Sequence, residues 1–227
     1  MTDPRIERPD PAPQDDFQVS RRGFLKGAGG ALTGGALSAA ALAQGGAAAQ
    51  TQAAEAAEGL SGELPLVLEI NGQRRQIQVE PRTTLLSALR HRCEPALTGS
   101  KEVCGRGNCG ACTVLLDGQP AYACLILAVE AEGRAVTTVE GLGSPEALSE
   151  VQAAFCDKDA LMCGFCTPGF VVAATALLAR SPAATRPEIV SGLCGNLCRC
   201  GTYPHVFDAV EVARDRLAAR APQGGAR

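Results

Sequence analysis

Eight of the eleven cysteines in this chain form two groups of four, and these groups limit what the chain can fold into. The first group has the spacing Cys-x4-Cys-x2-Cys with a fourth cysteine further on; its members are Cys104, Cys109, Cys112 and Cys124. The second combines a Cys-x2-Cys with a later Cys-x-Cys; its members are Cys163, Cys166, Cys198 and Cys200. The chain has 227 residues, and a domain of fewer than about 80 residues usually needs a covalent or metal staple. Each group can supply one.

The first group predicts an iron–sulfur cluster. Four thiolates are the ligand set of one such cluster, and Cys-x4-Cys-x2-Cys is the plant-type spacing for a 2Fe–2S centre. Structural zinc sites usually show two short paired spacings instead. Disulfides suit exported proteins, but three cysteines within nine residues would be crowded and strained partners. A Rieske centre needs two histidine ligands, and His91 and His205 lie beside no suitable cysteine.

The loop between Cys104 and Cys112 fits this interpretation. Its backbone must wrap closely around a compact cluster, so we expect positive φ angles at Gly105, Gly107 and Gly110. Backbone amides in such a loop can donate hydrogen bonds to the sulfurs.

The second group is less specific by spacing alone. A four-sulfur zinc site or a 4Fe–4S cluster also needs four cysteines, so both stay open beside a 2Fe–2S cluster. Two clusters in one small chain would indicate electron transfer rather than bond-making chemistry.

Residues 1–49 are expected to be a Tat signal peptide. The pair Arg21-Arg22 precedes an uncharged stretch of mostly Gly, Ala and Ser, and small residues at 41–43 or 47–49 could mark the cleavage point. The stretch is too weakly apolar for a permanent membrane helix. The Tat translocase accepts folded proteins, which suits a protein whose clusters need reduced thiolates during assembly. We therefore expect a periplasmic protein, with residues 50–62 as a linker.

A first domain is expected over residues 63–140. The pattern predicts strands at 66–70 and 75–79 around an Asn71-Gly72 turn, then a helix capped by Thr83 or Thr84. Further strands are expected at 113–116 and 135–139, with the Asp117-Gly118 turn between them.

A second, all-helical domain is expected over residues 144–220, followed by a tail at 221–227. Ser144 with Pro145, Pro168, Pro187 and Val206 are the expected helix starts. In the last helix Val206, Val210, Ala213 and Leu217 form one apolar stripe. The second group of cysteines would then lie at helix ends, and the fold class is α+β.

Three segments resemble the iron–sulfur subunits of the xanthine dehydrogenase, or molybdenum hydroxylase, family. They are Met162–Gly169, Leu197–Tyr203 and Cys104–Val114, and the resemblance covers about residues 64–215. It implies a β-grasp, plant-type ferredoxin-like 2Fe–2S domain followed by an all-α, four-helix 2Fe–2S domain. All eight grouped cysteines would be cluster ligands.

The resemblance also implies partners. The cluster on Cys163, Cys166, Cys198 and Cys200 would be the inner one, nearest a molybdopterin cofactor in a separate large subunit. The cluster on Cys104, Cys109, Cys112 and Cys124 would be the outer one, facing an acceptor such as a FAD subunit, a cytochrome or a soluble carrier. Aldehydes or N-heteroaromatic substrates would be oxidised on the partner, so no catalytic residue is expected in this chain.

Two positions depart from the family pattern. Many relatives have Gln where this chain has Met162, and that Gln approaches the pterin. Gly201-Thr202-Tyr203 replaces the common Thr-Gly-Tyr, a variant similar to exported or cytochrome-linked members. From this likeness, an acceptor other than NAD is expected. No nicotinamide or flavin motif occurs in the chain.

The remaining residues are given structural roles. Cys93, Cys156 and Cys194 are expected to be buried small hydrophobic residues, with a disulfide or an alternative ligand role left open, above all for Cys194. His91 and His205 are expected on helix surfaces or at caps. Arg106 and Arg199 lie within the ligand loops, where they either raise a cluster's potential or form salt bridges.

Two other functions stay open at this point. One is a free-standing periplasmic ferredoxin-like carrier, and the other is a binding module stapled by zinc or disulfides. Nucleic-acid binding is not expected, because no cluster of Lys and Arg occurs in the sequence.

Overall fold

The sheet of the first half begins with a hairpin. In the computed structural model, which describes residues 62–220, β1 (Leu64–Ile70) and β2 (Gln73–Val79) pair antiparallel, with Ile70 opposite Gln73. Asn71 and Gly72 both have positive φ, 53° and 73°. These angles fit the tight turn that an Asn-Gly pair favours, so the predicted hairpin is confirmed.

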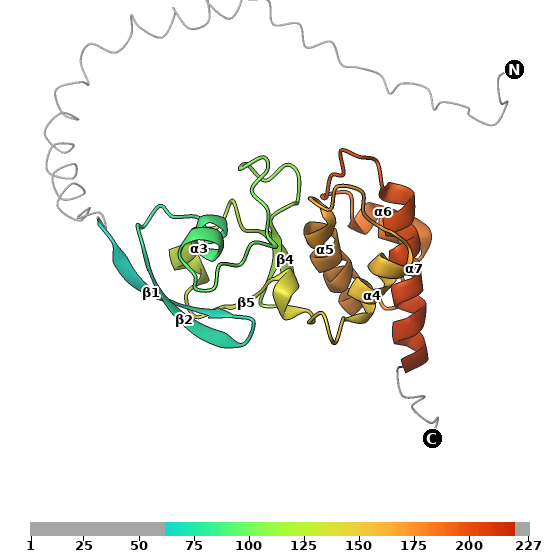
Figure 1. Ribbon diagram of the computed structural model, residues 1–227, viewed down its shortest axis with the longest axis horizontal. Helices are drawn as coiled ribbons and strands as arrows, with labels where there is room; N and C mark the ends of the chain where they lie inside the picture. Colours follow the sequence, from blue (N-terminus) through green and yellow to red (C-terminus); the bar gives the residue numbers. More distant parts are fainter. Residues whose placement is uncertain (1–61, 221–227) are drawn as a thin grey trace, which may run out of the picture. The chain divides into compact units, whose positions relative to one another are not determined.

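Within the described residues the sheet has five strands, in the order β2-β1-β5-β3-β4. Its other members are β3 (Thr113–Leu116), β4 (Gln119–Tyr122) and β5 (Ala135–Thr137). Figure 1 labels β1, β2, β4 and β5. β5 runs parallel to β1 and antiparallel to β3. The Asp117-Gly118 turn joins β3 to β4 and not to the strand near residue 135, so that expectation was wrong. The sequence of β4 does not alternate and contains Pro120, which is tolerated because β4 is an edge strand.

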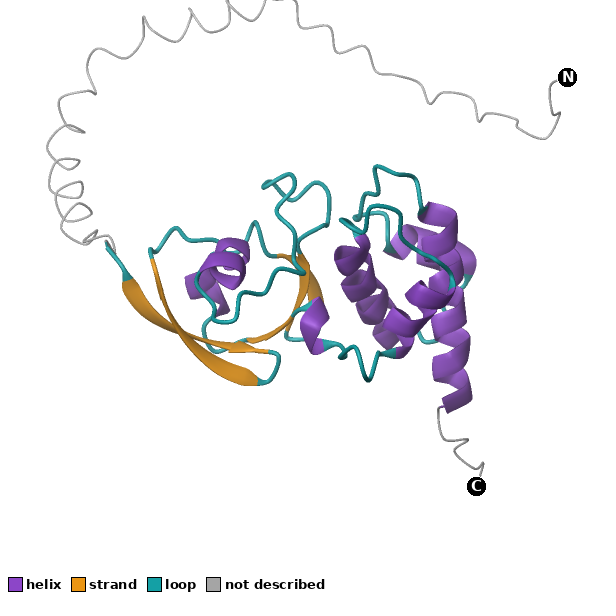
Figure 2. Cartoon of the chain, in the orientation of Figure 1, coloured by secondary structure: helices purple, strands orange, loops and turns teal. Residues whose placement is uncertain are grey.

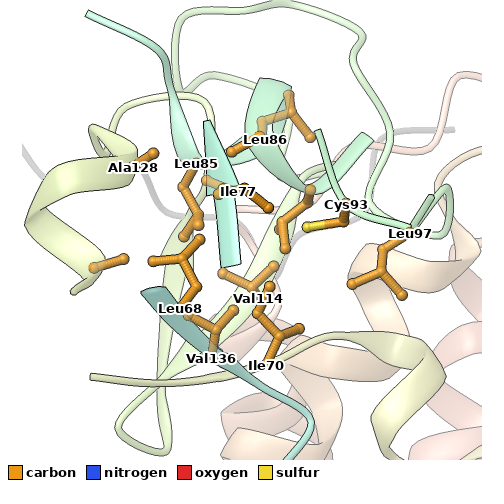
Figure 3. Packing of buried hydrophobic residues seen from close by; sticks show 14 of the residues in the cluster. Leu68, Ile70, Ile77, Leu85, Leu86, Cys93, Leu97, Val114, Ala128 and Val136 are labelled. Carbon is orange, nitrogen blue, oxygen red and sulfur yellow. The ribbon is translucent and has the colours of Figure 1, made fainter. Parts of the chain in front are cut away.

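A short helix of the first half packs on this sheet. α3 (Leu85–His91) begins after Thr84, whose hydroxyl accepts a hydrogen bond from the Ser87 amide at 3.2 Å. Figure 3 shows Leu85 and Leu86 packed among sheet residues such as Leu68. A short mixed sheet gripping one helix is the β-grasp arrangement, and the expected ferredoxin-like half is confirmed.

Helices form the second half (Figure 2). They are α4 (Glu150–Asp157), α5 (Thr167–Arg180), α6 (Arg186–Gly192) and α7 (Tyr203–Arg220). Each contributes to one core, with Phe155, Phe170, Ile189 and Val206 almost fully buried. The expected four-helix architecture and the α+β class are confirmed. On α7, however, Leu217 is 40% exposed and leaves the predicted stripe.

The first of these helices does not start at Ser144. Ser149 precedes α4, and its hydroxyl accepts from the Gln152 amide at 3.3 Å while the Gln152 side chain accepts from the Ser149 amide at 2.9 Å. This Ser-x-x-Gln capping box satisfies two amides at once. Ser144 instead pairs with Ala147 in a turn.

A small apolar cluster joins the two halves. Leu115 of β3 packs against Val172 and Ala176 of α5. This contact seats α5 against the sheet, so the segments that carry the two cysteine groups belong to one folded unit.

None of the helices within residues 62–220 is both long and apolar enough to cross a membrane. The expected signal peptide, nearly all of the linker and the tail lie outside the described residues.

Truncating the helical core should lower stability sharply. Phe170 is fully buried, and its ring meets that of Tyr203 edge to face at 6.1 Å. We expect Phe170→Ala to cost about 3–5 kcal/mol, which lowers the unfolding temperature by roughly 6–20 °C. Leu217→Ala on α7 is the control and should cost less than about 1 kcal/mol. Circular dichroism melts of the two cluster-loaded variants measure this, and equal losses would contradict the assigned core.

Candidate iron–sulfur sites

Three cysteines of the first group, Cys104, Cys109 and Cys112, lie on a glycine-rich loop between α3 and β3. Gly105, Gly107 and Gly110 have φ angles of 61°, 73° and 68°, as predicted. A side chain at these positions would be strained, because L-residues rarely adopt positive φ. The loop can therefore curl tightly around a small group, and Cys124 is brought to it by the β3-β4 hairpin.

Backbone amides of this loop point at sulfur atoms. The Gly107 amide donates to Cys124 Sγ at 3.3 Å, and the Asn108 amide donates to Cys104 Sγ at 3.3 Å. Such hydrogen bonds favour the ionised thiolate, which is the form that binds metal. The expectation of amide donors to sulfur is confirmed for these two.

The four thiols of the first group meet as two pairs. The Arg106 amide, together with a hydrogen bond to Cys109, lowers the pKa of Cys104 to about 6. Burial raises the pKa of Cys112 to about 12, and the adjacent Cys124 thiol adds to the rise. Cys104 thus pairs with Cys109, and Cys112 pairs with Cys124.

The second group shows the same arrangement at helix ends. Cys166 is the residue that precedes α5, and its pKa is raised to about 12 by burial and by the Cys198 thiol. Burial opposes ionisation of Cys198, but hydrogen bonds from Thr202 prevail and lower its pKa to about 7. The Cys163 backbone lowers the pKa of Cys200, but the adjacent Cys163 thiol, together with desolvation, outweighs it, so the pKa of Cys200 is raised. The pairs are therefore Cys166 with Cys198 and Cys163 with Cys200.

This pairing fits a two-metal cluster better than a single ion. Across residues 62–220, no three His, Cys, Asp or Glu side chains gather as ligands of one metal ion would. A 2Fe–2S cluster instead takes two thiolates on each of its two irons. Both groups of four provide two pairs, so the residues present fit the cluster.

Two residues behind the second group were missed by sequence reasoning. The Tyr203 hydroxyl accepts a hydrogen bond from the Cys198 amide at 2.9 Å, and Thr202 Oγ1 lies 3.5 Å from Cys198 Sγ. Their place in the variant segment Gly201-Thr202-Tyr203, close after Cys200, was the available signal. Gly164 and Gly201, with φ of 76° and 81°, give this site the same backbone freedom as the first.

The three other cysteines differ from one another. Cys93 is 2% exposed and sits in the sheet core (Figure 3), as predicted. Cys156 and Cys194 are exposed, so the expectation of burial was wrong for both. Cys156 lies near the end of α4, and Cys194 lies just after α6, so both are at helix ends rather than on a buried helix face. All eleven cysteines are free thiols within the described part of the chain.

The remaining candidates lie on the surface. His91 ends α3, and His205 near the start of α7 places Nδ1 3.0 Å from the Lys158 carbonyl oxygen. Both are exposed on helices, as predicted. Arg106 and Arg199 are exposed within the two ligand loops.

Comparison with known proteins agrees with this geometry. A model of the 2Fe–2S iron–sulfur cluster binding domain matches residues 68–138, and a model of the [2Fe–2S] binding domain matches residues 138–211. The aldehyde oxidoreductase iron–sulfur-binding subunit PaoA of Escherichia coli K12 is 41% identical over 169 residues, which cover 68% of this chain and 73% of the relative. The nicotine 6-hydroxylase small subunit of Paenarthrobacter nicotinovorans is 46% identical over 150 residues, or 66% of this chain and 89% of the relative.

The chain belongs to the iron–sulfur subunits of the xanthine dehydrogenase, or molybdenum hydroxylase, family.

Solved structures of this family share the fold. A chain of quinoline 2-oxidoreductase from Pseudomonas putida 86 matches with a TM-score of 0.66 and 42% identity, over 70% of this chain and 99% of that chain. The aldehyde oxidoreductase of Desulfovibrio desulfuricans matches with a TM-score of 0.65 and 41% identity, over 68% of this chain but 17% of that longer chain. The family's two 2Fe–2S domains thus coincide with the two halves described above.

The cluster-free thiols of this family member should react unequally. Since the thiolate is the nucleophile, Cys104 with a pKa of about 6 is mostly ionised near neutral pH, whereas Cys112 with a pKa of about 12 is protonated. We expect iodoacetamide to label Cys104 of the reduced, metal-free protein well before Cys112. Labelling of Cys104 should decline as the pH falls through about 6. Mass spectrometry resolves the two, because trypsin cleaves after Arg106, and equal rates near neutral pH would contradict the assignment.

Proposed function

We propose that this chain is the electron-transfer subunit of a periplasmic molybdenum hydroxylase that oxidises aldehydes or N-heteroaromatic compounds. The main support for this proposal is that one folded unit holds two sites, each with four thiols arranged as two pairs. The substrate class is supported by relatives named for aldehyde, nicotine and quinoline oxidation.

The eight cysteines would hold the two clusters, each of which accepts and releases single electrons when bound. Cys104, Cys109, Cys112 and Cys124 hold the outer cluster, and Cys163, Cys166, Cys198 and Cys200 hold the inner one. This chain contributes the thiolates, the amide donors to sulfur and the glycine turns that bring them close. It contributes no acid, base or nucleophile that acts on substrate.

The partner is a large molybdopterin-binding subunit, placed beside the second cysteine group. Support comes from large apolar side chains exposed around that group, namely Met162 (71% exposed), Phe165 (52%) and Leu197 (52%). Apolar side chains gathered at the surface of a soluble protein often mark an interface. Met162, next to Cys163, would face the pterin side where many relatives have Gln. A FAD subunit, a cytochrome or a soluble carrier would take electrons from the outer cluster.

Export is proposed to proceed through the Tat translocase. The support is the Arg21-Arg22 pair followed by an uncharged, small-residue stretch and small-residue cleavage positions. Folding before export would allow both clusters to be assembled where thiols stay reduced.

Variants that lack one ligand of either group should allow the two clusters to be told apart by iron content and EPR signal. The complex purified from periplasm should contain about four irons per chain, with molybdenum in a co-purifying large subunit. We expect Cys109→Ala and Cys166→Ala each to lose about two irons and a different one of two EPR signals. Iron assay and low-temperature EPR of the reduced protein measure this.

Cys156→Ala and Cys194→Ala are the matched controls for these variants. Both cysteines are exposed and lie outside the two groups, so all irons should be retained. Loss of iron in either control would overturn the ligand assignment. A wild-type chain that carried its irons without molybdenum or a partner would favour a free-standing carrier instead.

The export signal can be tested separately. Replacing Arg21 and Arg22 by Lys should abolish export, because the twin-arginine pair is the feature that the translocase reads. The protein should then collect in the cytoplasm, as followed by cell fractionation and immunoblotting. The same replacement at Arg5 and Arg8 is the control and should leave export intact, whereas continued export of the first variant would refute the proposal.

A further inference from the structure

A backbone hydrogen bond links the loops that carry the two cysteine groups. The Leu197 amide donates a hydrogen bond to the Cys109 carbonyl oxygen at 2.9 Å. Leu197 directly precedes Cys198 of the second group, and Cys109 belongs to the first. From one thiol to the other, the route is covalent except for this single hydrogen bond.

The residue before Leu197 is buried in the same junction. Asn196 is 5% exposed, and its Nδ2 donates to the Gly110 carbonyl oxygen at 2.9 Å and to Thr113 Oγ1 at 3.3 Å. The Thr113 hydroxyl in turn donates to the same Gly110 carbonyl at 2.6 Å. Thus one amide group from the second loop bridges two positions of the first. A buried network of this kind stabilises a unique arrangement only when its members are satisfied.

Close approach at Gly110 leaves little room for another arrangement. A Cβ atom there would lie 2.6 Å from Asn196 Nδ2 and 2.6 Å from the Gly195 carbonyl oxygen. A Cβ atom at Gly169 on α5 would overlap the Gly110 carbonyl oxygen. Three segments therefore meet at Gly110 with backbone against backbone.

A neighbouring contact strengthens the same junction. The Tyr122 hydroxyl, at the end of β4, donates to the Gly195 carbonyl oxygen at 3.0 Å. The three consecutive residues 195–197 thus each bond to the first half of the chain. Of their side chains, only that of Asn196 supplies such a bond, because Gly195 and Leu197 act through backbone atoms.

We propose that Asn196 is a positioning residue for electron transfer between the two clusters. It holds the loop that carries Cys198 against the loop that carries Cys109, and so fixes the Leu197–Cys109 hydrogen bond and the separation of the clusters. The inference rests on the proposed function, because it takes the eight cysteines as cluster ligands. Electron tunnelling weakens steeply with distance, so a small loosening of this junction would slow transfer while leaving each cluster intact.

Asn196→Ala in the cluster-loaded complex tests this. Both clusters are paramagnetic when reduced by one electron, and neighbouring paramagnets split or broaden each other's EPR lines. We expect the variant to keep the full iron content of the wild type but to show a weaker line splitting. Hydrogen–deuterium exchange of the peptide that contains Leu197 should become faster, since its amide loses a fixed partner.

Two further variants make the outcome unambiguous. Thr113→Val removes the hydroxyl that accepts from Asn196 and donates to the Gly110 carbonyl oxygen, but it leaves the Asn196–Gly110 hydrogen bond in place. It should therefore change both measurements in the same direction but less, and it replaces Asn196→Ala as the test if that variant does not accumulate. Ile189→Val truncates a fully buried side chain of α6 outside the junction and should cost about 0.5–1.5 kcal/mol. Its splitting and Leu197 exchange should match the wild type.

The outcomes separate this inference from the proposed function. Suppose that Asn196→Ala and Thr113→Val keep the full iron content and leave both the EPR line splitting and the Leu197 amide exchange unchanged. That result would overturn the positioning role while leaving the proposed function in place. The same change in Ile189→Val would also overturn it, because general destabilisation would then explain the effect. Fewer irons than two clusters need in the wild type would defeat the proposed function itself.

Discussion

Four thiols can be held in two close pairs only if some residues of the surrounding backbone adopt positive φ angles. Thiolates repel one another, and a buried thiol is hard to ionise, so each ligand needs a hydrogen-bond donor or the metal itself as compensation. The amides of Gly107 and Asn108 provide such donors, and they can reach sulfur because Gly105 and Gly107 adopt positive φ. The cysteine loops begin and end at strands of the β-grasp sheet and at helices, which hold the loop ends in place.

The two sites reach the same arrangement by different routes. In the first, three cysteines lie on one short loop and only Cys124 comes from elsewhere. In the second, the pairs Cys166–Cys198 and Cys163–Cys200 join the start of α5 to the segment after α6. The first site depends mainly on loop conformation, whereas the second depends on how helices pack, with Phe170 and Tyr203 in contact directly behind it.

Features dictated by local chemistry were predictable from the sequence. The Asn71-Gly72 hairpin, the loop glycines and the helix start at Pro168 all follow from backbone preferences of single residues. The strand β4 was not predictable, because an edge strand needs neither alternation nor the amide that Pro120 lacks. The start of α4 depended on choosing between two serines, and the structure selects Ser149, whose partner Gln152 completes a capping box. No sequence pattern pointed to a role for Asn196, because that role depends on the contact between the two halves.

The route of the chain between the second set of ligands has a consequence for the order of events during biogenesis. Cys163 and Cys200 are separated by the whole of α5 and α6, so this site does not exist until those two helices have folded back on each other. The first site needs only its loop and one hairpin. Metal insertion at the second site would therefore report that the helical half has reached its native topology. A chain stalled before that stage would offer a complete set of four cysteines only at the first site.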